Sequence, residues 1–177
     1  MKRILVLVAA LALASASCSG AHSVPGSYRL GANPGTGLVV LSTRIHKVRE
    51  VCRTGSSVSV GFSSGPRSHS LDIGGLFAAA DLEDPPGYFF VRELPAGTYT
   101  LDYIEMDGSR SPKPLDRSFR VIEGKAVYLG EFRVTVLPSC REVTFAVTDR
   151  WLTQDRQLFA SRMANIDPQV VENQTIP

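Results

Sequence analysis

Apolar and polar residues alternate with a period of two along most of the chain from Leu38 onward. Residues 57–62 are one example, because Val58, Val60 and Phe62 share one face of an extended segment and small residues occupy the other. This alternation is typical of β-strands that are buried on one face. Alternating patterns, or apolar runs rich in β-branched and aromatic residues, occur in seven segments: 37–45, 57–62, 87–94, 98–104, 117–122, 131–136 and 141–147. We therefore expect a mainly β protein that folds as a single antiparallel β-sandwich of about seven strands.

Two short connections between these segments are typical of tight turns. Residues 94–97 (Leu-Pro-Ala-Gly) fit a type I turn, because Pro95 fixes φ at the second position and Gly97 accepts a positive φ at the fourth. Glu123 and Gly124 lie between two strand patterns and predict a hairpin turn.

The period changes to that of a helix between residues 149 and 166. Large apolar residues recur there at helical spacing or on adjoining positions: Trp151, Leu152, Leu158, Phe159, Met163 and Ile166. Asp149 or Thr153 is suited to cap the start of this helix, and Asn165 to end it. We expect one C-terminal amphipathic helix packed on a sheet. A helix that docks on a partner or a membrane surface is the alternative. It has less support because the other face mixes Asp155, Arg156 and Gln157 and carries no basic stripe.

The first residues have the layout of a secretory signal peptide. A basic start is followed by an unbroken apolar run at residues 4–14 and by small residues at 15–17. The run is too short to span a bilayer as a stable helix. Ordinary cleavage after Ala16 would release a soluble protein that starts at Ser17. Cleavage directly before Cys18 would instead release a protein that starts with a cysteine.

Residues 14–18 (Ala-Ser-Ala-Ser-Cys) resemble the lipobox of bacterial lipoproteins, although the chain has Ser15 where that pattern prefers leucine. The resemblance implies that the thiol of Cys18 receives a diacylglycerol, and Ser19 behind it resembles an outer-membrane sorting signal. Three acyl chains, as the resemblance implies, exceed the roughly two that stable anchoring needs. We therefore expect a palmitate-bearing outer-membrane lipoprotein of the bacterial envelope that faces the periplasm, with a soluble periplasmic protein as the alternative.

The chain contains three cysteines, Cys18, Cys52 and Cys140, and an exported protein with an odd number has one thiol left over. If Cys18 carries the lipid, Cys52 and Cys140 remain as a pair that the oxidising periplasm can bridge. We expect this disulfide, which would close a long loop and contribute about 4–5 kcal/mol in the chain-entropy model. Two separate thiols buried in the core are the alternative.

Residues 19–37 are rich in Gly, Ser, Pro and Asn and predict a flexible tether. The expected organisation is a signal peptide at 1–17, a lipidated cysteine with its tether at 18–37, and one β-sandwich domain with its helix at 38–177. Loss of the signal peptide removes the two basic residues at positions 2 and 3 and leaves 17 basic and 17 acidic residues. This balance gives no indication of a nucleic-acid partner.

Residues 87–104 resemble the strand-turn-strand of small transthyretin-like sandwiches, such as carboxypeptidase regulatory-like modules. In both, a glycine-led apolar strand runs into Leu-Pro-x-Gly-x-Tyr and a second strand follows. Residues 118–134 resemble the Gly-x-x-x-Tyr-x-Gly strand of uncharacterised bacterial envelope lipoproteins with such a domain. The resemblance implies a β-sandwich at the envelope and no catalytic residues. The motif also has a physical explanation, because Tyr99 can bury its ring while its hydroxyl binds a nearby backbone group in a tyrosine corner.

Residues 61–65 (Gly-Phe-Ser-Ser-Gly) match the Gly-x-Ser-x-Gly pattern of a hydrolase nucleophile, with Ser63 at its centre. That arrangement needs a helix directly after the serine, whereas a Gly-Pro pair follows here, and the chain lacks the strand-helix alternation of an α/β-hydrolase. The base would have to be one of three histidines: His22, His46 and His69. We interpret the segment as a surface loop between two strands and expect no enzyme activity.

Metal and acid chemistry have little support in the sequence. There is neither a Cys-x-x-Cys pair nor two closely spaced histidines, so we expect no metal site and no cofactor. Asp81, Glu83 and Asp84 cluster in a proline-rich segment, which we interpret as a solvated loop rather than as paired catalytic acids.

Positive charge concentrates in the segment 44–53, which contains Arg44, His46, Lys47, Arg49 and Arg53. On a membrane-tethered domain these side chains would suit anionic lipid headgroups. A solvated strand end is the alternative.

Aromatic residues gather between positions 88 and 103, and Tyr88 is the candidate ring for stacking on a sugar. Most of these rings lie on alternating positions, which favours packing in the core. Tyr88 and Phe90 share one parity and Phe89 has the other. At least one ring is therefore expected to face away from the main core.

Together these patterns indicate a non-catalytic envelope lipoprotein, tethered to a membrane, that serves as a structural or accessory module. Its partners would be the membrane, through the lipid, and an envelope protein bound at strand edges or loops. The alternative is a periplasmic module that binds carbohydrate or peptidoglycan. The residues leave the oligomeric state open.

Overall fold

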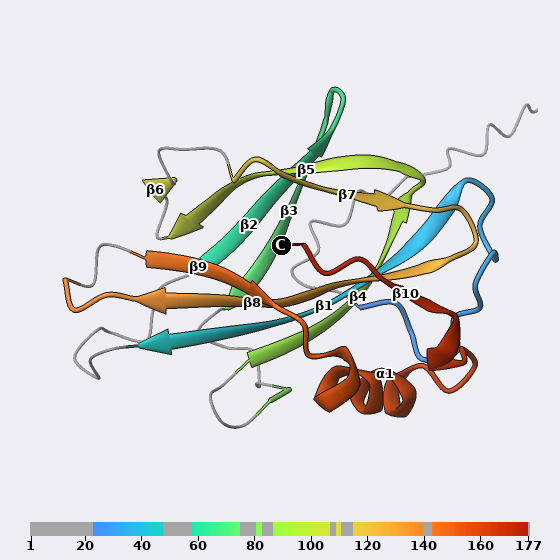
Figure 1. The fold of residues 1–177 in the computed structure, drawn as a ribbon. Coiled ribbons are helices and arrows are strands. Elements are labelled where there is room, and N and C mark those ends of the chain that lie inside the picture. The colour runs from blue at the N-terminus through green and yellow to red at the C-terminus, as the bar shows by residue number, and fades with distance from the viewer. Residues whose placement is uncertain are drawn as a thin grey trace, which may run out of the picture.

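The computed structural model describes residues 23–47, 58–74, 81–82, 87–106, 109–110, 115–139 and 143–176. These residues form ten strands in two sheets, followed by a short helical region near the C-terminus (Figure 1). The expectation of a mainly β protein with one C-terminal helix is confirmed.

One sheet, which we call the helix-side sheet, is built around β1 (Thr36–Lys47). On one side β1 pairs antiparallel with β4 (Gly87–Pro95), and on the other it pairs in parallel with β8 (Ala126–Val136). The far side of β8 pairs in parallel with β10 (Val171–Asn173) and, further along, antiparallel with β9 (Val143–Thr148). The expectation of a purely antiparallel fold is therefore wrong, because β1 and β8 run in the same direction.

The second sheet is antiparallel throughout its described pairs. It contains β2 (Val58–Ser64), β3 (Arg67–Gly74), β5 (Gly97–Met106), β6 (Ser109–Arg110) and β7 (Arg117–Val121). Strand β2 lies between β3 and β5, and the other side of β5 pairs with β6 and β7.

Each of the seven segments predicted as strands overlaps one strand of the structure, and β3, β6 and β10 are additional strands. The loop predicted at residues 61–65 is shorter than expected, because residues 61–64 belong to β2 and Gly65 and Pro66 alone form the turn of a β2–β3 hairpin. Strand β3 has a weak sequence signal, since Ser68 and Ser70 are exposed and, among residues 67–72, only Leu71 is well buried.

Both predicted connections join consecutive strands, but each links the two sheets, and Gly97 lacks the positive φ predicted for it. Strand β4 ends at Pro95 in the helix-side sheet, and Gly97 begins β5 in the second sheet. In the other turn the N–H of Lys125 donates to the carbonyl of Ile122 at 3.1 Å, and Gly124 has a positive φ of 66°. The hairpin predicted there is wrong, because β7 pairs with β5 and β8 pairs with β1.

Tyr99 forms the predicted tyrosine corner. Its ring is buried and stacks on Phe119, with 5.3 Å between the ring centroids. Its hydroxyl donates a hydrogen bond to the carbonyl oxygen of Pro95 at 2.8 Å. Because Pro95 ends β4 and Tyr99 lies in β5, this bond holds the crossing from one sheet to the other.

Two apolar clusters hold the layers together. The main core lies between the two sheets and includes Val39 and Leu41 from β1 and Val60 and Phe62 from β2. The second core lies between the helix-side sheet and the helical region and contains, among others, Leu38, Val40, Phe89, Trp151, Phe159 and Met163. Strand β1 is therefore buried on both faces, since successive side chains point to opposite sides of a sheet.

The helical region lies on the side of the helix-side sheet that faces away from the second sheet (Figure 1). It consists of a π-helical turn, η1 (Trp151–Asp155), then α1 (Arg156–Arg162) and a 3₁₀ turn, η2 (Pro168–Val170). Leu152, predicted to lie on the buried stripe, is 79% exposed, because the wide first turn brings Trp151 against the sheet instead. The predicted caps are wrong, because Arg150 precedes η1 without a side-chain cap and α1 ends at Met163 rather than at Asn165. The carboxylate of Asp149 nevertheless accepts the N–H of Trp151 at 3.0 Å.

Candidate functional site

Six polar side chains meet between the helix-side sheet and the helical region, and we call them the buried polar network. They are Ser42 and Arg44 from β1, Tyr128 and Glu131 from β8, and Gln154 and Asp155 from η1. Five of the six are buried, and Gln154 is partly buried.

A β-bulge places the two β8 members of this network on the same face. The pairing of β1 with β8 shifts register between Val40 and Ser42, where Gly130 has a positive φ of 110°. Residues three apart in a regular strand point to opposite faces. The extra residue at the bulge therefore lets both Tyr128 and Glu131 face the helical region.

Asp155 is the centre of one half of the network. Its Oδ2 accepts hydrogen bonds from the hydroxyls of Ser42, at 2.5 Å, and Tyr128, at 2.6 Å. Its Oδ1 is buried and has no hydrogen-bond partner among the described residues. These bonds fix η1 to β1 and β8.

Burial determines the ionisation of this half. Desolvation raises the pKa of Asp155, and the hydrogen bonds from Ser42 and Tyr128 only partly oppose the rise. Desolvation and the neighbouring Asp155 raise the pKa of Tyr128 far above its usual value. Tyr128 is therefore neutral at physiological pH, and its hydroxyl donates to Asp155 and accepts the N–H of Arg150 at 3.3 Å.

Arg44 and Glu131 form the other half of the network. The Nε of Arg44 lies 2.7 Å from Oε2 of Glu131, and both side chains are buried. The Nη2 of Arg44 donates to Gln154 at 2.8 Å, and Arg133 reaches the second oxygen of Glu131 at 2.7 Å. The prediction that Arg44 contributes to a surface for anionic headgroups is wrong, because its guanidinium is enclosed by the helical region.

Two of the other members of the predicted basic segment lie at the end of β1, and two lie outside the described residues. His46 is exposed and Lys47 is the last residue of β1. Arg49 and Arg53 fall in a part of the chain that the structure does not describe, so their role in a headgroup site stays a prediction.

The residues predicted as a flexible tether pack on the domain from Ser23 onward, and we call residues 23–35 the N-terminal strap. The N–H of Val24 donates to the carbonyl of Val91 at 2.8 Å, and the hydroxyl of Ser23 accepts the N–H of Val91 at 3.2 Å. Val24, Tyr28 and Leu30 pack against the second core. The tether prediction is wrong for the strap, because a few apolar side chains attach it to the edge of β4.

Glu93 on β4 holds the middle of the strap. Its carboxylate accepts hydrogen bonds from the hydroxyl of Tyr28 at 2.7 Å, from the amide of Asn33 at 2.8 Å, and from the hydroxyl of Thr36. Burial raises the pKa of Glu93, but these three hydrogen bonds together hold that pKa below its usual value.

Side chains complete the cover of the β4 edge. The carboxylate of Asp81 accepts the N–H of Phe89 at 2.8 Å, and Arg162 of α1 donates to the carbonyl of Phe89 at 3.2 Å. Arg162 and Asp81 also form an ion pair. Asp81, predicted to lie in a solvated loop, thus takes part in closing an edge that would otherwise offer free backbone groups.

The aromatic residues of β4 divide between the two cores. Phe90 lies in the main core, and the partly buried ring of Tyr88 packs beside it with 6.2 Å between centroids. Phe89 lies in the second core, which confirms that one ring faces away from the main core. The packing of Tyr88 gives no particular support to sugar stacking.

Ser63 and His69 lie on opposite faces of the second sheet. His69 is the cross-strand partner of Phe62 and stacks on its ring, with 5.5 Å between centroids. Ser63 points to the other face, where its hydroxyl donates to Asp102 at 3.0 Å. Burial lowers the pKa of His69, and the nearby Arg92 and Arg67 lower it further. The geometry does not bring the serine and histidine of the hydrolase pattern together.

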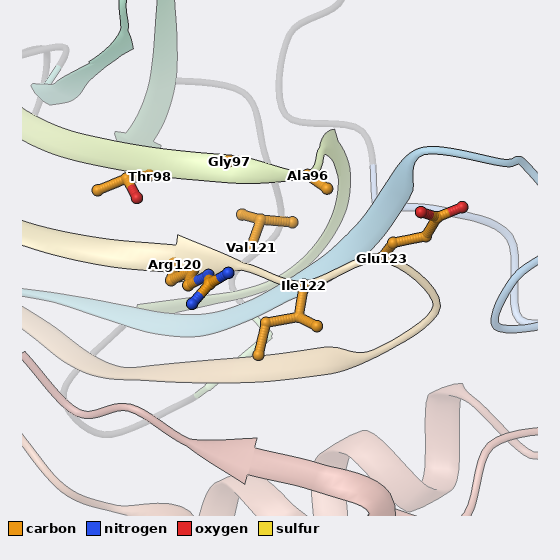
Figure 2. Close-up of a pocket in the computed structure, with 7 residues that line it drawn as sticks. All are labelled: Ala96, Gly97, Thr98, Arg120, Val121, Ile122 and Glu123. Atoms are coloured by element: carbon orange, nitrogen blue, oxygen red, sulfur yellow. The ribbon is translucent and has the colours of Figure 1, made fainter.

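An open hollow of about 490 Å³ lies at the ends of β5 and β7, and Figure 2 shows the residues that line it. They are Ala96, Gly97, Thr98, Arg120, Val121, Ile122 and Glu123. Glu123 accepts the N–H of Gly35 in the strap at 2.8 Å. Only Arg120, Glu123 and Thr98 bring polar side chains, and this set provides neither a paired acid and base nor a nucleophile with its base.

Three sequence predictions concern cysteines that the structure does not describe: Cys18, Cys52 and Cys140. Among the described residues, no helix has the length and apolar character needed to cross a bilayer. The same residues contain no group of three or more His, Cys, Asp or Glu side chains suited to hold a metal.

The comparisons with known proteins leave the family open. No family model and no curated protein matches the chain. Among solved structures, a leucine-rich repeat protein from Bacteroides thetaiotaomicron aligns with 58% of this chain at 16% identity and a TM-score of 0.35. The aligned part spans only 14% of that protein.

Sequence reasoning missed the buried polar network. It assigned Asp155 to the polar face of the helix, although Asp155 lies four residues from both Trp151 and Phe159, which are buried. That spacing was the available signal. Nothing in the sequence around Ser42 on β1 or Tyr128 on β8 predicts a contact with Asp155.

Proposed function

We propose that this protein is a non-catalytic lipoprotein of the bacterial envelope, held in the outer membrane by an acylated Cys18 with its domain in the periplasm. The head of the chain carries the proposal, because its basic start, apolar run and small residues end directly at Cys18. The strap is consistent with it, since Ser23, which is fixed to β4, follows Cys18 by only five positions in the sequence.

The proposed domain is a transthyretin-like β-sandwich that binds another envelope protein. Two sheets that share one core and a tyrosine corner at Tyr99 are consistent with this class. Among the described residues β9 pairs with β8 alone, so its outer edge is available for an added strand of a partner. The edge of β4 is covered by the strap and is not available.

A non-catalytic role is favoured by where the reactive side chains lie. The carboxylates of Glu131 and Asp155 are buried and engaged in the polar network. Ser63 and His69 face opposite sides of their sheet, which separates the nucleophile from its base.

Metabolic labelling tests the lipid anchor. The full chain is expressed in a Gram-negative host with a palmitate analogue, and label and membrane fractionation are compared between wild type and Cys18→Ala. Cys52→Ala is the matched control, because it also removes one thiol but leaves the lipobox intact. We expect label and membrane association in wild type and Cys52→Ala only. A soluble, unlabelled wild-type product that starts near Ser17 would overturn the proposal.

A second measurement tests the disulfide between Cys52 and Cys140. Peptide mass mapping of protein purified from the periplasm, with and without reduction, should find the two cysteines in one cross-linked peptide pair. Free thiols at both positions in the unreduced protein would contradict the pairing.

A further inference from the structure

We infer that the face formed by the strap and the helical region rests against the lipid surface, and that the second sheet is turned away from the membrane. The inference rests on the proposed acylation of Cys18 and adds to it a specific orientation of the domain. It identifies a lipid surface as the partner of one face and leaves the other face to protein partners.

The length of chain between the anchor and the domain is the first argument. Cys18 precedes Ser23, the first residue fixed to β4, by five positions. An extended chain spans at most about 3.3–3.6 Å per residue, so the Cα of Ser23 lies within about 18 Å of the Cα of Cys18. The edge of β4 is therefore held close to the bilayer.

The place where the strap is fixed is the second argument. Ser23 shares the carbonyl of Phe89 with Arg162, the last residue of α1. Further along, the amide of Asn165 donates to the carbonyl of Ser27 at 3.2 Å. The strap thus enters the domain beside the C-terminal end of α1, so a short anchor brings the helical side to the membrane.

The distribution of exposed side chains is the third argument. The large hydrophobic residues that are exposed in the described structure are Leu152, at 79%, and Val170, at 48%, and both belong to the helical region. Val170 borders an open hollow of about 530 Å³ that Arg29 and Leu30 of the strap and the acidic Asp167 also line. Exposed apolar side chains suit the boundary between headgroups and acyl chains.

The exposed residues of the second sheet's outer face near β7 have the opposite character, while the partly buried ring of Tyr103 covers Gly61 on the same face. Tyr99 and Leu101 point into the main core, so Thr98 and Thr100 point outward from β5, and Ser118 is exposed beside them on β7. These short polar side chains are suited to water. The helical side therefore exposes apolar side chains and the second sheet exposes polar ones. This difference is the one expected if the helical side faces the lipid.

Energy transfer from tryptophan to a lipid probe tests the orientation, because the chain contains a single tryptophan, Trp151, on the helical side. The acylated full chain is reconstituted in vesicles of phosphatidylethanolamine and phosphatidylglycerol that carry dansyl-labelled lipid. The comparison protein is Trp151→Phe combined with Thr100→Trp, which moves the donor to the outer face of the second sheet. Ser118→Trp in the Trp151→Phe background is the replacement if the first variant does not fold by circular dichroism.

We expect transfer from Trp151 to be several-fold stronger than transfer from position 100 or 118. Stacked sheets are about 10 Å apart, so the two donors are separated by at least this distance along the membrane normal. Equal transfer, or stronger transfer from the second sheet, in an acylated and membrane-bound protein would overturn the orientation alone. A wild type that lacks acylation and behaves as Cys18→Ala in fractionation would overturn the proposed function and the orientation with it.

Discussion

The guanidinium of Arg44 and the carboxylate of Glu131 lie 2.7 Å apart between the parallel strands β1 and β8, buried beneath the helical region. Without this pairing, β1 would place the charge of Arg44 and β8 the charge of Glu131 under η1 without a buried counter-ion. The pair also links the sheet to η1, because Arg44 donates to Gln154. The helical region is therefore attached to the sheet by charge and hydrogen bonds as well as by the second core.

Removal of one partner of this pair should be costly. Arg44→Met leaves the carboxylate of Glu131 buried with Arg133 as its remaining cation, and we expect the free energy of unfolding to fall by about 3–5 kcal/mol. Urea denaturation followed by circular dichroism measures this loss.

The double variant Arg44→Met with Glu131→Leu is the control, because it removes both charges and fills the space with apolar atoms. It should be more stable than Arg44→Met alone, since replacement of a whole buried pair is often nearly neutral. Strictly additive losses in the double variant would contradict the coupling between the two residues.

Asp155 should make stability depend on pH in an unusual direction. Its pKa is raised in the folded protein, so the folded state holds this proton more tightly than the unfolded chain. The resulting stabilisation is fully present below the pKa of the unfolded chain and is lost as pH rises through the folded pKa. Denaturation curves from pH 3 to pH 8 should therefore show that the advantage of wild type over Asp155→Asn decreases as pH rises.

Tyr128→Phe provides a matched test of the same carboxyl group. The hydroxyl of Tyr128 lowers the pKa of Asp155, so its removal should raise that pKa further and extend the pH dependence to higher pH. If wild type and Asp155→Asn give parallel curves across this range, Asp155 does not titrate with a raised pKa.

The tyrosine corner should contribute through its hydroxyl as well as through its ring. Tyr99→Phe keeps the stacking on Phe119 but removes the hydrogen bond to Pro95. We expect a loss of about 0.5–1.5 kcal/mol in the free energy of unfolding, the usual net contribution of one hydrogen bond. Phe119→Leu serves as the comparison because it alters the stacking and leaves the hydroxyl in place. A Tyr99→Phe variant as stable as wild type would show that the corner adds nothing to the fold.

The strands and the corner were predictable because their signals are local. Alternation at residues such as Val58, Val60 and Phe62 reports which face is buried, and the turn chemistry of Pro95 and Gly97 lies within four residues. Local patterns do not report which strands pair. The same patterns therefore predicted a hairpin at Glu123 and an antiparallel fold, whereas β1 and β8 pair in parallel across a long separation.

The buried polar network and the strap depend on contacts between distant residues. Ser42 meets Asp155 across 113 positions, and Tyr28 meets Glu93 across 65. For Asp155 the sequence offers only its spacing from Trp151 and Phe159, and for Glu93 it offers no comparable pattern. The composition of the strap resembles that of a linker, and only a few apolar residues such as Val24 and Leu30 distinguish it from one.

The attachment of the strap should depend on Glu93. Glu93→Ala removes the acceptor for Tyr28, Asn33 and Thr36, and hydrogen bonds to charged groups contribute about 1.5–3 kcal/mol. Opening of the strap should therefore become at least about tenfold more frequent, while the sheets stay folded. Hydrogen exchange at the N–H of Val24 and tryptic cleavage after the exposed Arg29 both report this opening.

Glu172→Ala is the control, because Glu172 is an exposed carboxylate on β10 and has no described hydrogen bond to the strap. Glu172→Ala should leave the rate of hydrogen exchange at Val24 and the rate of cleavage after Arg29 unchanged. In the membrane-bound protein, Glu93→Ala should also weaken energy transfer from Trp151 to the labelled lipid, because a released strap lengthens the connection between Cys18 and β1. Wild-type cleavage and exchange rates in Glu93→Ala would show that the second core alone holds the strap.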